Sequence, residues 1–354
     1  MLLLSFALAL ADSRHLLFVG NSYTQAGNLH QVAGALFLEG APTGDDVSVA
    51  VAIPGYTLPQ HLADADGTHG DTALREALVT GTDTWDWVML QDQSQIPGFP
   101  EDQQEVLDSL AALPPLDALI AAKGAQTVLL MTWGRRSGDE MNPEWYPDYL
   151  TMQEKLAAGY ENYAAAITTP ERTAWVAPAG YSFRHVYDAA VAAGEDPLDE
   201  AGLFWRLYQV DGSHPSPLGT YMVACVVYST ISGNECTGLS APPDLAPDDV
   251  WAVQQAADAA VFAESPELTY PWGGTGGDTG TDTGGDSGGD TDTGPDTASD
   301  ADTAGSGDSG VIPIDVADDG TTPGGCGCAT APGPSAALGV LAALSLLSLR
   351  RRSA

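Results

Sequence analysis

The chain has 354 residues, of which 48 are acidic and 12 are lysine or arginine, so its formal net charge is −36. Nucleic acids and anionic lipid surfaces bind through lysine and arginine side chains that displace counterions, so this charge excludes both as expected partners. Only residues 12–272 have the mixture of apolar, polar and charged residues that is typical of a folded domain. This length is typical of one α/β domain.

Residues 1–11 form a short apolar segment that ends in Ala9-Leu10-Ala11. Small residues at these positions are typical of a signal peptide, although the positive charge that usually opens such a leader is missing. We therefore expect residues 1–11 to be a signal peptide and the protein to be exported. The alternative is that this segment begins the first helix or strand of the domain.

Five apolar runs have the length of buried parallel strands: residues 15–19, 47–53, 87–90, 127–131 and 173–176. Stretches with a helical period follow them: residues 29–38, 72–79, 103–122, 149–167 and 183–193. This alternation predicts a parallel sheet with helices on both faces. In such sheets the functional site lies at the carboxyl ends of the strands. Ser22 follows the first run, Gly55 the second and residues 91–94 the third, so we expect three loops to meet at one edge.

Asp211-Gly212-Ser213-His214 places an acid and a base three residues apart, just ahead of a proline-started helix. Free serine is a weak nucleophile at neutral pH and needs such a base. Together with Ser22, the pair supplies what is required to activate an alcohol. Structural alternatives remain open, since Ser22 could cap a helix, Gly55 could serve only a Pro-Gly turn, and His214 could be a loop histidine.

These motifs resemble the SGNH, or GDSL-like, hydrolase superfamily. Gly20-Asn21-Ser22 matches its first block, a strand followed by Gly-Asp/Asn-Ser, and Asp211 to His214 matches its last block, Asp-x-x-His. Gly55 fits the glycine after the second strand. The third block departs from the family pattern, because Gln91-Asp92-Gln93-Ser94 stands where the family commonly has Gly-x-Asn-Asp. Gln93 then takes the position of the asparagine, with Gln91 as the second choice.

The resemblance implies a three-layer α/β/α sandwich with a central parallel sheet, of the flavodoxin-like type. Ser22 would be the nucleophile, His214 the general base and acid, and Asp211 the group that orients His214. The backbone N–H groups of Ser22 and Gly55 and the side-chain amide of Gln93 would form the oxyanion hole. The family mechanism needs no metal and no organic cofactor.

A second acidic segment, Asp66-Gly67-Thr68-His69, repeats the Asp-Gly-x-His pattern of residues 211–214. With His61 and Asp64 it could bind a divalent metal. Its place between the second strand and a helix favours a solvated acidic loop.

Residues after the fourth strand give two further candidates. Arg135 and Arg136, in Trp133-Gly134-Arg135-Arg136, could grip a carboxylate or a sugar, or could lie in a solvated loop and balance nearby acids. Trp145, Tyr146 and Tyr149 could stack on a sugar or pack against the helix that follows.

Four cysteines are present. Cys225 and Cys236 are close enough in sequence to form a disulfide in an oxidising compartment, and two buried free thiols are the alternative. Cys326 and Cys328 belong to the C-terminal tail.

The C-terminal part divides in two. Residues 273–323 should be a disordered linker, because residues 273–310 are mainly Gly, Thr and Asp without any lysine or arginine. Residues 324–354 combine the two cysteines, an apolar stretch at 336–349 and three terminal arginines, which resembles the Myxo-CTERM type of bacterial surface-sorting tail. That resemblance implies attachment to the cell envelope, at the cell surface or outer membrane, and a sorting protease as a partner. A retained membrane anchor is the alternative.

These features lead us to expect a secreted, surface-attached serine esterase that hydrolyses small esters, with O-acetyl groups on carbohydrates as the favoured substrates. A lipase or thioesterase of the same superfamily is a second hypothesis. A catalytically silent glycan-binding surface module is the hypothesis from another class.

Overall fold

The computed structural model describes residues 14–43, 46–263 and 268–272. The expected signal peptide, linker and sorting tail lie outside these residues. Among the helices within the described ranges, none combines the length and the apolar character needed to cross a membrane.

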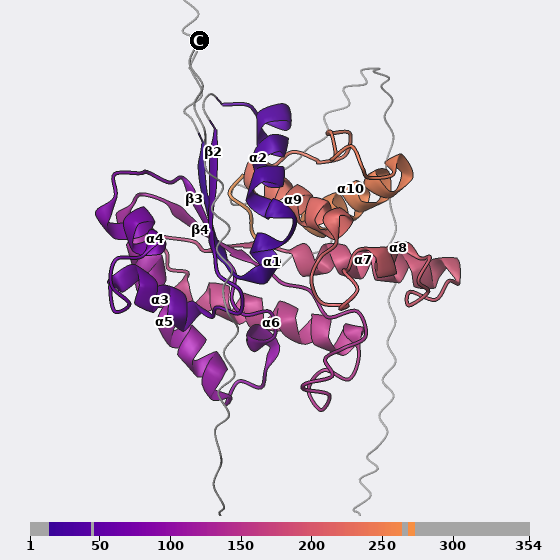
Figure 1. Cartoon of the computed structure of the whole chain (residues 1–354), viewed down its shortest axis with the longest axis horizontal. Helices are drawn as coiled ribbons and strands as arrows, with labels where there is room; N and C mark the ends of the chain where they lie inside the picture. The colour runs from indigo at the N-terminus through magenta and orange to yellow at the C-terminus, as the bar shows by residue number, and fades with distance from the viewer. Residues whose placement is uncertain (1–13, 44–45, 264–267, 273–354) are drawn as a thin grey trace, which may run out of the picture. The chain divides into compact units, whose positions relative to one another are not determined.

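A five-stranded parallel sheet forms the centre of the domain (Figure 1). Its strands are β1 (His15–Gly20), β2 (Val47–Ala52), β3 (Trp87–Leu90), β4 (Gln126–Leu130) and β5 (Trp175–Ala177). They lie in the order β2-β1-β3-β4-β5, and each neighbouring pair is parallel. The predicted strands and the flavodoxin-like parallel sheet are confirmed.

The strand order reverses at β1, which has β2 on one side and β3 on the other. β1 and β3 pair from Leu16 with Trp87 to Val19 with Leu90. Open α/β sheets hold their ligands outside the carboxyl ends of the strands at such a reversal. The topology therefore directs attention to the residues that follow β1 and β3.

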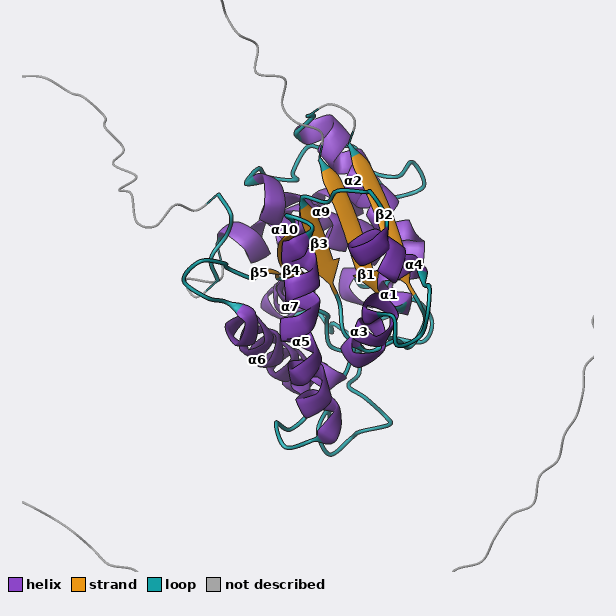
Figure 2. Cartoon of the chain, turned by 90° about the vertical axis from the view of Figure 1, so that its left-hand side faces the viewer, coloured by secondary structure: helices purple, strands orange, loops and turns teal. Residues whose placement is uncertain are grey.

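Two helical layers cover the sheet (Figures 1 and 2). One layer packs on strand residues such as Phe18 and Met89 and consists of α2 (Leu29–Gly40), α7 (Ala179–Ala193), α9 (Pro217–Ser232) and α10 (Pro247–Phe262). The other packs on alternate residues such as Leu17 and Val88 and consists of α3 (Leu58–Asp66), α5 (Gln104–Ala122) and α6 (Tyr149–Ile167). The three-layer α/β/α architecture is thereby confirmed.

Short helical segments complete the domain: α1 (Ser22–Gln25), η1 (Ala26–Asn28), α4 (Ala73–Arg75), the π-helical η2 (Glu76–Thr80), η3 (Ile96–Gly98) and α8 (Leu203–Arg206). The sequence pattern did not predict α3 or α10, and it indicated only the start of α9. Residues from Leu218 to Ile231 of α9 are all buried, so this helix has no polar face and shows no amphipathic period.

The segment interpreted as a solvated acidic loop is a helix over much of its length. Thr57 and Gln60 form a capping box at the start of α3, and Gly67 ends the helix in the left-handed conformation at φ 92°. His61 and Asp64 are buried on this helix. The expectation of a solvated loop is therefore wrong for these two residues.

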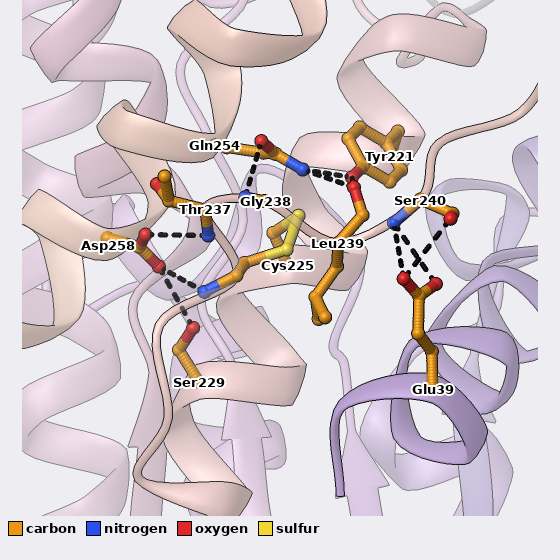
Figure 3. Close-up of a disulfide and its surroundings, with 11 residues drawn as sticks. Glu39, Tyr221, Cys225, Ser229, Thr237, Gly238, Leu239, Ser240, Gln254 and Asp258 are labelled. Atoms are coloured by element: carbon orange, nitrogen blue, oxygen red, sulfur yellow. Dashed lines mark hydrogen bonds between the residues drawn. A yellow bond between two sulfur atoms is a disulfide. The ribbon is translucent and has the colours of Figure 1, made fainter.

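A disulfide joins Cys225 on α9 to Cys236 in the loop that precedes α10 (Figure 3). Beside it, the buried Asp258 accepts hydrogen bonds from the Ser229 hydroxyl and from the backbone N–H groups of Cys236 and Thr237, at 3.2, 2.7 and 2.9 Å. The disulfide and this carboxylate together fix the loop to both helices. Of the two states that the sequence left open for these cysteines, the bridged one is present.

Candidate active site

Ser22 lies in a tight turn between β1 and α1. Asn21 caps the short helix, because its Oδ1 accepts a hydrogen bond from the backbone N–H of Tyr23 at 3.1 Å. Capping, which was the structural alternative for Ser22, thus belongs to Asn21. The Ser22 hydroxyl instead faces the loop that carries His214.

Two consecutive hydrogen bonds link Ser22, His214 and Asp211. His214 Nε2 lies 2.8 Å from Ser22 Oγ, and His214 Nδ1 lies 2.6 Å from Asp211 Oδ2. An ionised carboxylate can only accept, so Nδ1 carries the hydrogen and Nε2 is the acceptor for the serine hydroxyl. In this arrangement a histidine can take the proton of a serine.

Asp211 is held in place by its own turn. Its Oδ1 accepts hydrogen bonds from the backbone N–H groups of Ser213 and His214, at 2.9 and 3.0 Å. Burial acts to raise the pKa of Asp211, but the hydrogen bonds from His214 and from the two backbone groups outweigh it and bring the pKa below its ordinary value. The carboxylate is therefore ionised at neutral pH, the state that stabilises a protonated His214.

Aromatic rings brace the histidine. Tyr23 stacks on Trp133 with ring centroids 4.9 Å apart and meets the edge of His214 at 5.2 Å. The Tyr23 hydroxyl lies 2.7 Å from Ser213 Oγ, and Trp133 Nε1 donates to the Ser213 carbonyl at 3.2 Å. These contacts fix the Asp211 to His214 turn against the loop that contains Ser22.

Gln91, directly after β3, holds the turn before the serine. Its Oε1 accepts from the Asn21 backbone N–H at 3.1 Å and from the Thr24 hydroxyl at 2.8 Å, while its Nε2 donates to Asn21 Oδ1 at 3.0 Å and to the Asp92 carbonyl. Both amide hydrogens of Gln91 are thus used within the protein. A Cβ on Gly20 would lie 2.4 Å from Thr24 Oγ1 and 2.7 Å from Gln91 Oε1, so this close packing requires glycine.

The Asn21 side chain joins the three loops that were expected to meet. Its Nδ2 donates to the carbonyl of Tyr56, after β2, at 3.1 Å and to the carbonyl of Asp92, after β3, at 3.0 Å. With the bonds to Tyr23 and Gln91, its hydrogen-bonding capacity is filled. The loops after β1, β2 and β3 therefore form one connected edge.

His61, considered as a metal ligand, instead supports the same turn. It is fully buried, and its Nε2 donates to the Gly20 carbonyl at 3.0 Å. Burial lowers its pKa to about 4, so the ring is neutral at neutral pH. His69 pairs with Asp64 at 2.6 Å, and the described residues contain no group of three or more potential ligands arranged for a metal.

The two other residues proposed for the oxyanion hole lie on the loops after β2 and β3. Gly55 has φ 77° in a Pro54-Gly55 turn that Tyr56 N–H closes onto Ile53 O at 3.1 Å, the geometry of a type II turn. Gln93 donates one amide hydrogen to Gln95 Oε1 at 2.8 Å, and its other amide hydrogen has no acceptor in the part of the chain that the structure describes. The turn explains why a glycine stands at position 55, and the oxyanion roles of both residues stay predictions.

The residues after β4 that the sequence suggested for substrate binding lie in different environments. Arg135 pairs with the buried Asp139 at 2.5 Å. The Tyr146 hydroxyl donates to the Gln95 carbonyl at 2.6 Å, and Tyr149 packs among aromatic rings, so both contribute to packing. Trp145 is half-buried against Phe99 at 4.8 Å.

No protein-family model and no curated protein matches the chain. Solved structures do match it. A DUF4886 family protein from Bacteroides uniformis is 18% identical with a TM-score of 0.54, and the match covers 73% of this chain and 98% of that protein. This protein shares the fold of the chain.

SGNH hydrolases and acetylxylan esterases are also among the structural neighbours. A protein from Slackia heliotrinireducens that is proposed to be an SGNH hydrolase is 24% identical over 62% of this chain and 99% of that one, with a TM-score of 0.46. An acetylxylan esterase from Geobacillus stearothermophilus is 16% identical over 62% of this chain and 94% of that one, with a TM-score of 0.40.

Proposed function

We propose that the protein is a serine esterase that cleaves small esters, with O-acetyl groups on carbohydrates as the favoured substrates. The observation that carries this proposal is the hydrogen-bonded chain from Ser22 Oγ through His214 to Asp211. Its place at the reversal of the strand order supports the same conclusion.

In the proposed reaction, Ser22 Oγ attacks the ester carbonyl carbon while His214 Nε2 takes the serine proton. The tetrahedral intermediate then collapses, and the departing alcohol takes that proton from Nε2, which leaves an acyl-Ser22. Water attacks the acyl group with His214 as the base, so the carboxylic acid leaves and Ser22 regains its proton. Asp211 holds the ring and stabilises its charged state throughout.

The developing oxyanion needs hydrogen-bond donors close to Ser22. We assign this role to the backbone N–H groups of Ser22 and Gly55 and to the free amide hydrogen of Gln93. Gln91 is a poorer candidate than Gln93, because both of its amide hydrogens are used within the turn.

The substrate class and the location belong to the same proposal. A net charge of −36 opposes approach to anionic membranes, which favours carbohydrate esters over lipids. The Cys225–Cys236 disulfide supports export, since such bridges persist in oxidising compartments. Attachment to the bacterial surface through residues 324–354 is part of the proposal that rests on the sequence alone.

Hydrolysis of p-nitrophenyl acetate tests the assignment, and the chain provides a matched control. His69 and His214 each pair with an aspartate at 2.6 Å, but only His214 has the serine on its other nitrogen among the described contacts. We expect His214→Ala to lower kcat at least about 10⁴-fold and His69→Ala to keep most of the activity.

The opposite pattern would show that the Asp66 to His69 segment carries the base. A folded wild-type protein without hydrolysis of any ester would favour the glycan-binding module. A preference for long-chain acyl esters over acetyl esters would favour the lipase or thioesterase hypothesis.

A further inference from the structure

Arg136 differs from the other cationic side chains of the described residues in having no hydrogen-bond acceptor. Each of the others donates to at least one: Arg14, Arg75, Lys123, Arg135, Lys155, Arg172, Arg184 and Arg206. Arg136 is nevertheless only 8% exposed, and its Nε is buried without a hydrogen-bond acceptor among the described residues. Such a charge is costly to bury unless something pairs with it.

The guanidinium of Arg136 lies over an indole ring. Its Cζ lies 3.3 Å from the centroid of the Trp205 ring. Stacking uses the face of the guanidinium and leaves its N–H donors, which lie in the plane, without acceptors. A rigid, stacked fork of donors is the arrangement that binds a carboxylate through two parallel hydrogen bonds.

This guanidinium lies against the turn that carries the acid and the base. The Arg136 backbone N–H donates to the Gly212 carbonyl at 2.8 Å. A Cβ built on Gly212 would lie 3.4 Å from Arg136 Nη2 and 3.5 Å from Cζ, so the backbone of Gly212 packs close to the guanidinium. Gly212 lies between Asp211 and His214 in the sequence, which places the free donors beside the candidate active site.

The nearby carboxylates do not accept hydrogen bonds from the side-chain N–H groups of Arg136 among the described contacts. Asp211 and Glu200 act on Arg136 electrostatically, but neither forms an ion pair with it among the described contacts. Asp211 is already bonded to His214 and to two backbone N–H groups. Burial lowers the pKa of Arg136 from its ordinary value, although an arginine stays charged at neutral pH.

We propose that Arg136, stacked on Trp205, is a subsite for a carboxylate of the substrate, and that the esters cleaved are those of acidic sugars. This inference rests on the proposed esterase function. In a chain with a net charge of −36, a general attraction for anions is absent, so an acidic substrate needs a local cation of this kind.

A matched pair of substrates tests the subsite. The two are an O-acetylated methyl glucuronopyranoside and the matching methyl glucopyranoside, which differ only in that C6 is a carboxylate in the first and a hydroxymethyl group in the second. We expect the wild-type protein to prefer the acidic ester in kcat/KM by about 10-fold or more, the range of a hydrogen bond to a charged group. Arg136→Gln should bring this ratio close to one, and Arg136→Lys should give an intermediate ratio because it keeps the charge and loses the planar fork.

Arg184→Gln is the control. Arg184 is on α7, where its partners are Asp188 and Glu154, and its loss should leave the ratio unchanged. The subsite is refuted if the wild-type protein shows no preference, or if Arg136→Gln lowers kcat/KM equally for both esters, as a residue that only positions the Asp211 turn would. Preference for a 6-sulfate over the carboxylate would also overturn the assignment.

Failure of the subsite can be told apart from failure of the esterase. If p-nitrophenyl acetate and the neutral sugar ester are hydrolysed without preference for the acid, only the subsite is wrong. Binding gives a readout without turnover: the Ser22→Ala protein should bind methyl glucuronoside at least about 10-fold more tightly than methyl glucoside in calorimetry. That difference should disappear in the Ser22→Ala, Arg136→Gln double variant, and equal affinities in the Ser22→Ala protein would contradict the proposal.

Discussion

The side chains around Ser22 fall into two groups, those that contact the reacting hydroxyl and those that shape the turn behind it. His214 belongs to the first group, at 2.8 Å from Ser22 Oγ. Asn21, Gln91 and His61 belong to the second, and their hydrogen bonds fix both sides of the peptide group between Gly20 and Asn21. The position of the nucleophile therefore depends on buried polar groups as much as on the triad.

His61 makes the stability of this turn depend on pH. Its pKa is about 4 in the folded protein and about 6.5 in an unfolded chain, so protonation favours unfolding. Its stabilising contribution is complete above pH 6.5 and is lost as the pH falls toward 4. The two pKa values correspond to a loss of about 2 kcal/mol between pH 7 and pH 4.5.

Urea unfolding at these two pH values measures this contribution. His61→Asn keeps an N–H donor but cannot be protonated, so its unfolding free energy should fall by about 2 kcal/mol less than that of the wild type between pH 7 and pH 4.5. Equal decreases in the two proteins would show that His61 does not have the lowered pKa.

At the scale of elements, the loop that follows β3 contains two glutamines with different roles. Gln91 is 1% exposed and bonds Asn21 through both its oxygen and its nitrogen. Gln93, two residues later, is half-buried, and only one of its amide hydrogens has an acceptor among the described residues. The first glutamine should therefore govern stability, and the second should govern the rate of catalysis.

Alanine substitutions separate the two tasks. Gln91→Ala leaves buried groups of Asn21 without partners and should lower the free energy of unfolding by about 2 kcal/mol or more. Gln93→Ala should lower kcat by about 100-fold, as loss of an oxyanion donor does, with a change in unfolding free energy below about 1 kcal/mol. Full activity in Gln93→Ala would remove it from the oxyanion hole, and an unchanged unfolding midpoint in Gln91→Ala would contradict its structural role.

Sequence patterns predicted those elements whose periodicity is local. The strand runs are mostly apolar, and α6 coincides with the predicted range 149–167. α9 is buried on every side, so its sequence shows no amphipathic period. α3 lies in a segment whose many acidic residues are typical of a solvent-exposed loop. Ser22 and the Asp211 to His214 turn could be identified from short motifs. Short motifs could not reveal the roles of His61, Gln91 and Arg136. These roles depend on partners that lie 41, 70 and 69 positions away in the sequence.

At the scale of the whole molecule, the net charge of −36 and the single free guanidinium among the described residues act together. The charge repels anions in general, while Arg136 offers one place beside the candidate site where a carboxylate gains hydrogen bonds. The disulfide between α9 and the loop before α10 fits a protein that works outside the cytoplasm. The proposed export of the protein rests on the disulfide, and the proposed preference for acidic sugar esters rests on Arg136.

The central claim is that His214 activates Ser22 as a nucleophile. A fluorophosphonate probe reacts covalently with such a serine, and peptide mass spectrometry identifies the residue that carries the adduct. We predict labelling of the wild-type protein at Ser22, no labelling of Ser22→Ala, and labelling of His214→Ala slowed by at least about 10³-fold. A folded wild-type protein that stays unlabelled, or an adduct on a different serine, would contradict the account.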